Sequence, residues 1–243
     1  MRAVYVLLGI WIAVANPKLA HSDTPCPVPE DLVLRDLALP AAKQAVVRDH
    51  RLVVLTLGGA STAGLAAGDP GATYPARLQA ELTAALPGIT VNVANEAVPR
   101  NTTTAVPPAV PGLIAKTGAK LVLWAPGGRD AVRRSDPSEF FVAVQAGIDA
   151  VRHAGADLIL LDLQYVPSLE QMTRIEDYRD TLRGAASAND VPLLARHEMM
   201  RAWSEDGTLN LDATDKSEQT QVARRLFSCV AQTLAASIAE AVR

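Results

Sequence analysis

The stretch from residue 51 to residue 64 reads RLVVLTLGGASTAG, an apolar and β-branched run that leads into a glycine-rich turn. Residues 51–57 do not alternate between apolar and polar, which predicts a strand buried on both faces, as in a parallel sheet. Gly58 and Gly59 permit a sharp exit from that strand. Because many α/β hydrolytic enzymes hold their nucleophile on such an elbow, Ala60 and its neighbours are the first candidates for a functional site.

The rest of the chain alternates between short apolar runs and amphipathic helical patterns. Further strands are predicted at residues 89–93, 120–124, 157–163 and 191–194. Helices are predicted at residues 40–48, 74–86, 111–116, 136–155, 168–188, 198–203 and 221–242. This alternation implies parallel strands joined by right-handed crossovers. We therefore predict an α/β fold, a three-layer α/β/α sandwich with a five-stranded parallel sheet in flavodoxin-like order.

The N-terminal residues have the features of a secretory signal peptide. Arg2 precedes an apolar stretch, Val4–Val14, and Pro17 then breaks the helical pattern. The stretch is short for a membrane span. We predict cleavage after Ser22, and the alternatives are cleavage after Ala15 or an uncleaved membrane anchor.

Length and charge bound the remaining organisation. At 243 residues with 49% hydrophobic content, the chain fits one domain with a sizeable core. We predict a signal peptide at 1–22, an N-terminal strap at 23–50 and the main domain at 51–243. Loss of residues 1–22 changes the formal net charge from −3 to −5, and no basic cluster remains. We therefore expect no nucleic-acid partner and no stable membrane insertion after cleavage.

The two cysteines, Cys26 and Cys229, lie near the mature N-terminus and in the last predicted helix. Export to the periplasm or the medium allows them to form a disulfide, and two separate buried thiols are the alternative. Two cysteines without supporting histidines do not favour a metal site. The sequence contains no nucleotide or flavin motif, so we predict no cofactor.

Several stretches resemble the SGNH/GDSL hydrolases, in particular secreted bacterial members. Gly58 and the run Thr62–Gly64 match a first block of the form G-S-S-S-T-A-G or G-D-S-x-T-A-G. The similarity continues through ATYPARLQAELTAALPG, VLWAPGGRDAV, AGADLILLDLQYVP and FSCVAQTLA. The resemblance implies the SGNH hydrolase fold for the predicted sandwich. It places Gly59 before the nucleophile, Ala60 at the nucleophile itself, and Ser61 one residue late.

The next two blocks also depart from the family pattern. Where the family has N-x-G, this chain has Asn95-Glu96-Ala97, and the alanine retains the backbone N–H that would donate to an oxyanion. Where the family has G-T-N-D, this chain has Gly127-Gly128-Arg129-Asp130. Arg129 either fills the cleft or reaches toward an anion, and the alternative is an arginine in solvent paired with Asp130.

The last family block, D-x-x-H, is missing before the final helix. The chain has four histidines and none after His197. Aligning Phe227 and Cys229 with the family's Y-x-C places Glu218 at the aspartate and Gln221 at the histidine, and glutamine cannot act as a base. His153 and His197 are interpreted as packed or surface histidines rather than as recruited bases.

The match to D-L-Q-Y-x-P includes Asp162, Gln164 and Tyr165, which follow a predicted strand. They lie at the carboxyl end of a parallel strand, so we interpret them primarily as loop structure, and a pocket wall is the alternative.

These residues favour an exported pseudo-esterase that has lost hydrolysis but retains a cleft for an acyl or anionic glycan ligand. The first alternative is a weak or atypical serine esterase or lipase in which Ser61 is the nucleophile. The second is a structural or partner-binding envelope protein whose cleft is filled by side chains. A triad needs a serine, a base and a carboxylate together, and the resemblance places Ala60 at the serine and Gln221 at the histidine, so the sequence does not decide whether the chain is an enzyme.

Overall fold

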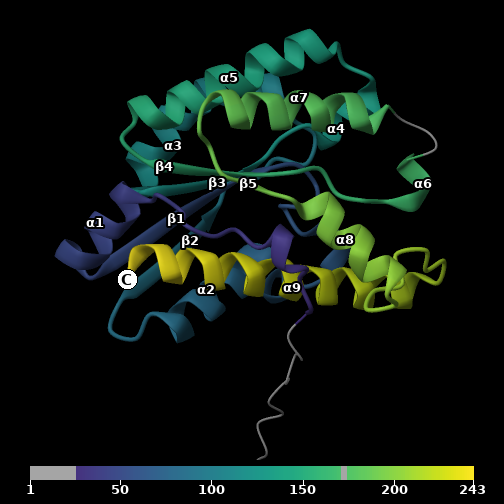
Figure 1. Ribbon diagram of the computed structural model, residues 1–243, viewed down its shortest axis with the longest axis horizontal. Coiled ribbons are helices and arrows are strands. Elements are labelled where there is room, and N and C mark those ends of the chain that lie inside the picture. The colour runs from purple at the N-terminus through teal and green to yellow at the C-terminus, as the bar shows by residue number, and fades with distance from the viewer. Residues whose placement is uncertain (1–25, 171–173) are drawn as a thin grey trace, which may run out of the picture.

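A single five-stranded parallel sheet organises the protein, as the computed structural model shows for residues 26–170 and 174–243 (Figure 1). The strands are β1 (Arg51–Gly58), β2 (Thr90–Asn95), β3 (Leu121–Ala125), β4 (Asp157–Leu161) and β5 (Leu193–Leu194). Their order is β2-β1-β3-β4-β5. The predicted fold class and the flavodoxin-like order are confirmed. The predicted signal peptide lies outside the described residues.

Helices cover both faces of the sheet. They are α1 (Pro40–Asp49), α2 (Tyr74–Ala85), α3 (Val110–Thr117), α4 (Gly128–Arg133), α5 (Pro137–His153), α6 (Pro167–Glu170), α7 (Ile175–Ala188), α8 (Arg196–Glu205) and α9 (Lys216–Val242). Short 3-10 turns occur at Glu30–Leu32, Leu65–Ala67, Pro70–Ala72, Thr103–Ala105 and Pro107–Ala109. Figure 1 shows α5 and α7 on one face of the sheet and α2 and α9 on the other.

Two hydrophobic cores follow from this layering, one on each face of the sheet. One core surrounds the fully buried ring of Trp203, and the other surrounds that of Trp124. Gly147 on α5 admits the Trp124 ring, because a Cβ at that glycine would lie 2.2 Å from the ring. The sequence pattern of buried strands between amphipathic helices thus produces two cores rather than one.

Some element boundaries differ from the sequence prediction. Helix α9 begins at Lys216 rather than at residue 221, because Asp215 caps it and accepts a hydrogen bond from the Glu218 amide at 2.9 Å. Its first turn is polar, so hydrophobic periodicity did not reveal it. Strand β4 ends at Leu161 instead of residue 163, and the short helix α4 was not predicted.

Residues 26–50, within the predicted strap, pack against the helices and strands that follow them in the chain. Cys26 and Cys229 form the predicted disulfide, and their Cα atoms are 5.4 Å apart. The indole N–H of Trp203 donates to the carbonyl of Pro27. On α1, the Ala42 amide donates to the Asp157 carboxylate at 2.8 Å, which ties the strap to β4. Within the described ranges, no helix combines the length and apolar character that a membrane crossing requires.

Candidate functional site

A cavity of about 270 Å³ lies at the carboxyl ends of β1, β3 and β4, and we call it the elbow cavity. Its walls include Ala60 and Ser61 after β1, Gly128 and Arg129 after β3, and Gln164 after β4. Strands β1 and β3 are neighbours in the sheet, and the chain leaves them in opposite directions. That position is the crevice where open parallel sheets bind their ligands.

The elbow that follows β1 is a tight turn built by glycine. Gly58 has φ +156°, and a Cβ there would lie 2.3 Å from Oγ1 of Thr62, so only glycine fits without displacement. The Ala63 amide donates to the Gly59 carbonyl at 3.0 Å and closes the turn. Ala60 is consequently exposed at the tip, and Ser61 beside it is half-buried.

Asn95 holds this turn against the sheet and does not line the cavity. Its Nδ2 donates to the Thr62 carbonyl at 3.1 Å, and its Oδ1 accepts from Thr56 Oγ1 at 3.1 Å and from the Ala97 amide at 3.2 Å. The Ala97 amide, a predicted oxyanion donor, is therefore engaged by Asn95. The cavity wall in this part of the chain comes instead from Asn101 and its neighbours.

The block that follows β3 separates Arg129 from Asp130. The Asp130 carboxylate is 2% exposed and accepts hydrogen bonds from Oγ1 of Thr103 at 2.8 Å and from the Thr103 amide at 3.1 Å. The Gly127 amide donates to the same Thr103 hydroxyl at 3.0 Å. Arg129 is exposed at the cavity rim, and no acidic side chain of the described residues pairs with it. The alternative of an Arg129–Asp130 pair is therefore wrong.

Glu218 and Gln221 lie on the exposed side of α9 and line neither cavity. Glu218 accepts a hydrogen bond from Nδ2 of Asn210 at 2.7 Å, which fastens the preceding loop. The structure thus does not bring these two residues to Ala60. That loop, residues 210–214, instead forms one wall of a second cavity.

This second cavity, which we call the loop cavity, has a volume of about 640 Å³. It shares Ala60, Ser61, Gln164 and Val166 with the elbow cavity, so the two spaces adjoin at the elbow. Its apolar walls include Leu65, Tyr165, Met200, Leu211, Leu226 and Phe227. The sequence did not reveal this cavity, because its walls come from four parts of the chain: residues 60–66, 164–168, 200 and 210–227.

No histidine of the described residues lines either cavity. His197 is buried on α8, its Nε2 lies 2.9 Å from Oε1 of Glu170, and its ring contacts the Tyr165 ring edge to face at 5.2 Å between centroids. His153 lies at the end of α5, with Nδ1 2.7 Å from the Asp149 carbonyl oxygen. None of the described histidines is therefore placed to activate a serine at the elbow.

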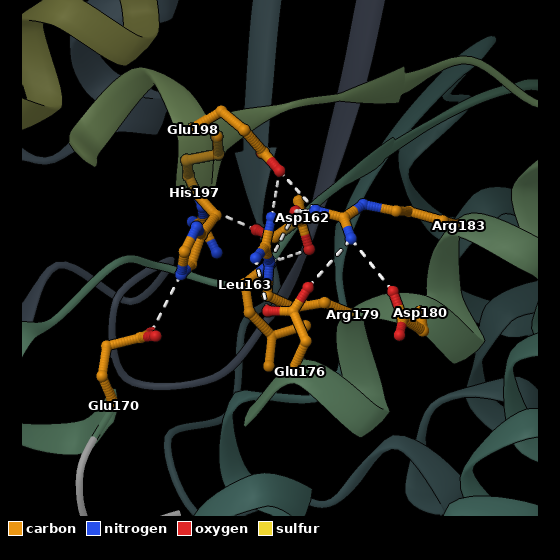
Figure 2. A network of polar contacts seen from close by, with 10 residues as sticks. Asp162, Leu163, Glu170, Glu176, Arg179, Asp180, Arg183, His197 and Glu198 are labelled. Carbon is orange, nitrogen blue, oxygen red and sulfur yellow. Dashed lines mark hydrogen bonds and ion pairs between the residues drawn. The ribbon is translucent and has the colours of Figure 1, made fainter. Parts of the chain in front are cut away.

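Asp162 belongs to a buried polar network beneath the site rather than to a cavity wall (Figure 2). Its carboxylate, 1% exposed, lies 3.1 Å from Nε of Arg179 and accepts from the Leu163 amide at 2.7 Å. Arg179 also pairs with Glu176 at 2.7 Å and with Glu198. The network joins the end of β4 to α7 and α8.

Burial and neighbouring charge act on the network in opposite directions. Burial raises the pKa of the Asp162 carboxyl, although Arg179 opposes that rise. Burial acts on Glu198 in the same sense, but a backbone hydrogen bond and the charges of Arg179 and Arg183 outweigh it and lower the pKa. The network thus holds Glu198 ionised at neutral pH.

Arg196 is the cavity residue that sequence reasoning missed. It is the first residue of α8, directly after β5, and it lines the elbow cavity although it is only 4% exposed. Its Nε donates to the Asp162 carbonyl at 2.8 Å. A basic residue just after the last strand was the available signal, since that edge of the sheet faces the site.

The described residues contain no group of three histidine, cysteine, aspartate or glutamate side chains arranged to hold a metal ion. The polar groups of the elbow cavity are hydroxyls, amides, arginines and the carboxylate of Asp130. Such groups can bind and orient a ligand through hydrogen bonds and charge.

Solved structures with the same fold include esterases and another hydrolase. LAE5, an α/β hydrolase enzyme from the metagenome of Lake Arreo in Spain, is 16% identical with a TM-score of 0.61, over 79% of this chain and 96% of that one. The acetyl xylan esterase AlAXEase is 16% identical with a TM-score of 0.59, over 74% and 100% of the two chains. The esterase AlinE4 is 21% identical with a TM-score of 0.53, over 68% and 84%.

The sheet order and these neighbours define the class of the fold, an α/β fold shared with AlinE4, an esterase of the SGNH-hydrolase family. Within that class, a model of the non-GDSL lipase-like family matches residues 25–243, and the chain belongs to that family. A comparison with curated proteins gives no significant match.

Proposed function

We propose that this protein binds a small acyl or glycan ligand in the elbow cavity and does not hydrolyse it by the serine–histidine route. The observation that carries this proposal is a preserved turn and cavity without the residues that hydrolysis requires. The turn and its cavity are intact, Ala60 occupies the tip, and no histidine of the described residues lines the walls. A hydrolase of this type needs both an oxygen nucleophile and a base at that point.

The two adjoining cavities suit a ligand with two chemically different parts. The elbow cavity presents hydroxyl, amide and guanidinium groups, and the loop cavity presents mainly apolar side chains. Together they resemble the usual composition of a small-molecule site, an apolar surface with a few polar groups that fix orientation. An acylated sugar has both parts, and AlAXEase, a protein of the same fold, is named as an acetyl xylan esterase.

Binding is tested by calorimetry with acetylated xylo-oligosaccharides on the wild-type protein and on Ala60→Phe, which fills the wall shared by both cavities. We expect the variant to lose the binding, because the new ring occupies the ligand's volume. Val47→Phe is the matched control, since Val47 is also exposed but lies on α1 and lines neither cavity. Equal binding by wild type and Ala60→Phe would place the ligand elsewhere and contradict the proposal.

Loss of hydrolysis is tested by intact mass after incubation with a fluorophosphonate, which marks activated serines. We expect no adduct under conditions that fully label an active SGNH esterase. An adduct mapped to Ser61 would overturn this part of the proposal.

Ser61 supports a second candidate function, a weak esterase. Its side chain is half-buried and lines both cavities, so its hydroxyl is beside any ligand at the elbow. The test is hydrolysis of p-nitrophenyl butyrate by wild type and Ser61→Ala. Activity that disappears in the variant would establish Ser61 as the nucleophile and would require a base from outside the described cavity walls.

We also propose export to the periplasm or the medium, with residues 1–22 removed. The Cys26–Cys229 disulfide supports this, since disulfides persist in oxidising compartments. The mass and N-terminal sequence of protein recovered from a cell fraction outside the cytoplasm test it. An N-terminus at Met1 in that fraction would contradict cleavage.

A further inference from the structure

The elbow cavity contains a buried positive charge whose terminal nitrogens are unused. Arg196 is 4% exposed, and only its Nε has a partner, the Asp162 carbonyl at 2.8 Å. No other hydrogen bond or ion pair involves its guanidinium group within the described ranges. The group lines the cavity, so its remaining N–H groups are available to a ligand there.

The neighbours of Arg196 do not supply the missing negative charge. Burial raises the pKa of Tyr74 to about 12, so the phenol beside Arg196 is neutral at pH 7. The Asp162 carboxylate is taken up by Arg179 at 3.1 Å and by the Leu163 amide at 2.7 Å. Arg196 therefore remains a desolvated cation, and burial lowers its pKa accordingly.

The cavity lining includes a second cation. Arg129 lies exposed at the rim without an acidic partner among the described residues. Among the described residues, the only carboxylate in the cavity wall is that of Asp130, which accepts from the Thr103 hydroxyl and amide. Two guanidinium groups and one satisfied carboxylate make the cavity a place that favours negative charge.

We infer that the elbow cavity recognises an oxyanion, a carboxylate or a phosphate group of its ligand, through the terminal N–H groups of Arg196 with Arg129 at the rim. This inference rests on the proposed function, because it takes the elbow cavity as the ligand site. Guanidinium groups suit this task, since their planar fork matches two oxygens of a carboxylate or phosphate. An anion bound in this way neutralises the positive charge of Arg196, which has no acidic partner among the described residues.

The test compares three four-carbon probes on the full mature protein by calorimetry at low salt: butyrate, butyl phosphate and neutral butanol. We expect butyrate or butyl phosphate to bind at least tenfold more tightly than butanol, and the better of the two identifies the oxyanion. Equal affinity for all three probes would overturn the inference, because charge would then contribute nothing.

Three variants locate the effect. Arg196→Met should weaken binding of the preferred anion at least tenfold. Arg196→Lys should retain part of the affinity, because the lysine ammonium keeps the positive charge but not the planar pair of N–H donors. Arg224→Met is the matched control, because Nε of Arg224 also donates to a backbone carbonyl, that of Ala67 at 2.8 Å, and Arg224 lines neither cavity. Unchanged anion affinity in a folded Arg196→Met would overturn the assignment.

A further variant keeps the inference testable if Arg196→Met does not fold. Ala60→Asp adds a carboxylate to the same cavity at an exposed position, and we expect it to lower the ratio of anion affinity to butanol affinity at least tenfold. No reduction would contradict the inference. The proposed function fails in a different way from this inference. Anion binding that survives Ala60→Phe would lie outside the cavity and would contradict the proposed function. Neutral ligands that bind in the cavity as tightly as anions would contradict the oxyanion inference alone.

Discussion

The buried network beneath β4 and the elbow that follows β1 lie close together in the fold but treat polar groups differently. In the network, the Asp162 carboxylate meets both Arg179 and the Leu163 amide. At the elbow, the hydrogen bonds come from backbone groups and from Asn95, and the tip residue is the apolar Ala60. The buried carboxylate of the network thus has charged and amide partners, whereas the fold forms the elbow without a nucleophile or a base. The architecture and the catalytic residues are therefore separable in this chain.

The largest expected effect is the loss of the network's central carboxylate. Asp162→Ala leaves Arg179, 4% exposed, without its innermost partner, and we expect a loss of about 3–5 kcal/mol in the free energy of unfolding. Denaturant unfolding measures this loss. The control is Lys116→Ala, which removes an ion pair with Glu96 whose lysine is 67% exposed, and which should cost less than about 1 kcal/mol. Equal losses of unfolding free energy in the two variants would show that the buried ion pair is no more important for stability than the exposed one.

The elbow itself should depend on one glycine and not on the next. Gly58→Ala places a Cβ 2.3 Å from Oγ1 of Thr62 at φ +156°, so we expect a cost of about 1–3 kcal/mol. Gly59→Ala meets no atom within 4 Å and should change stability by less than about 0.5 kcal/mol. Thermal unfolding of the pair tests this. A tolerated Gly58→Ala would show that the turn can relax, and that its shape is not fixed by close packing.

The fold was predictable because its signals are local. The apolar run at residues 51–57 and the cap at Asp136 each predict an element without knowledge of the rest of the chain. The structure confirms that strand as β1, and the Asp136 carboxylate accepts from the Ser138 amide at 2.7 Å at the start of α5. A polar helix start such as Lys216 has no apolar stripe, so its position was missed.

The site was predictable only in part, because its residues meet through the tertiary structure. Motif resemblance singled out Ala60, Ser61 and Arg129, and these three residues line one cavity. It also proposed Gln221, which lies on an exposed helix face, and it omitted Arg196, which no motif marks. A buried arginine with free N–H groups is defined by what surrounds it, and a single sequence does not contain those distances.

Acid should weaken the network through Glu198, and the sign follows from its pKa. A carboxyl whose pKa is lowered by folding stabilises the protein above its unfolded value of about 4.5, and that contribution disappears as the pH falls through the folded pKa. Asp162, whose pKa is raised, contributes in the opposite sense: its stabilisation is present below its unfolded value and lost as the pH rises through the folded pKa.

Glu198→Gln should therefore cost about 1 kcal/mol at pH 7 and little in strong acid, so that the plot of stability against pH becomes flatter. Urea unfolding between pH 7 and pH 3 measures the slope. Glu205→Gln is the control on the same helix, because Glu205 is 71% exposed and lies 3.7 Å from Arg201. The same slope in wild type and Glu198→Gln would show that the network does not carry the acid sensitivity.

The smallest expected effect is the one that tests the elbow's chemistry. Ala60→Ser restores a hydroxyl at the family's nucleophile position, and because Ala60 is exposed, stability should change by less than about 0.5 kcal/mol. A hydroxyl without a base remains a poor nucleophile, and the described cavity walls offer no imidazole. We therefore expect neither hydrolysis of p-nitrophenyl butyrate nor a fluorophosphonate adduct on the new serine. Labelling of that serine would mean that a base does reach the elbow, and the separation between architecture and catalysis would then rest on a single missing oxygen atom.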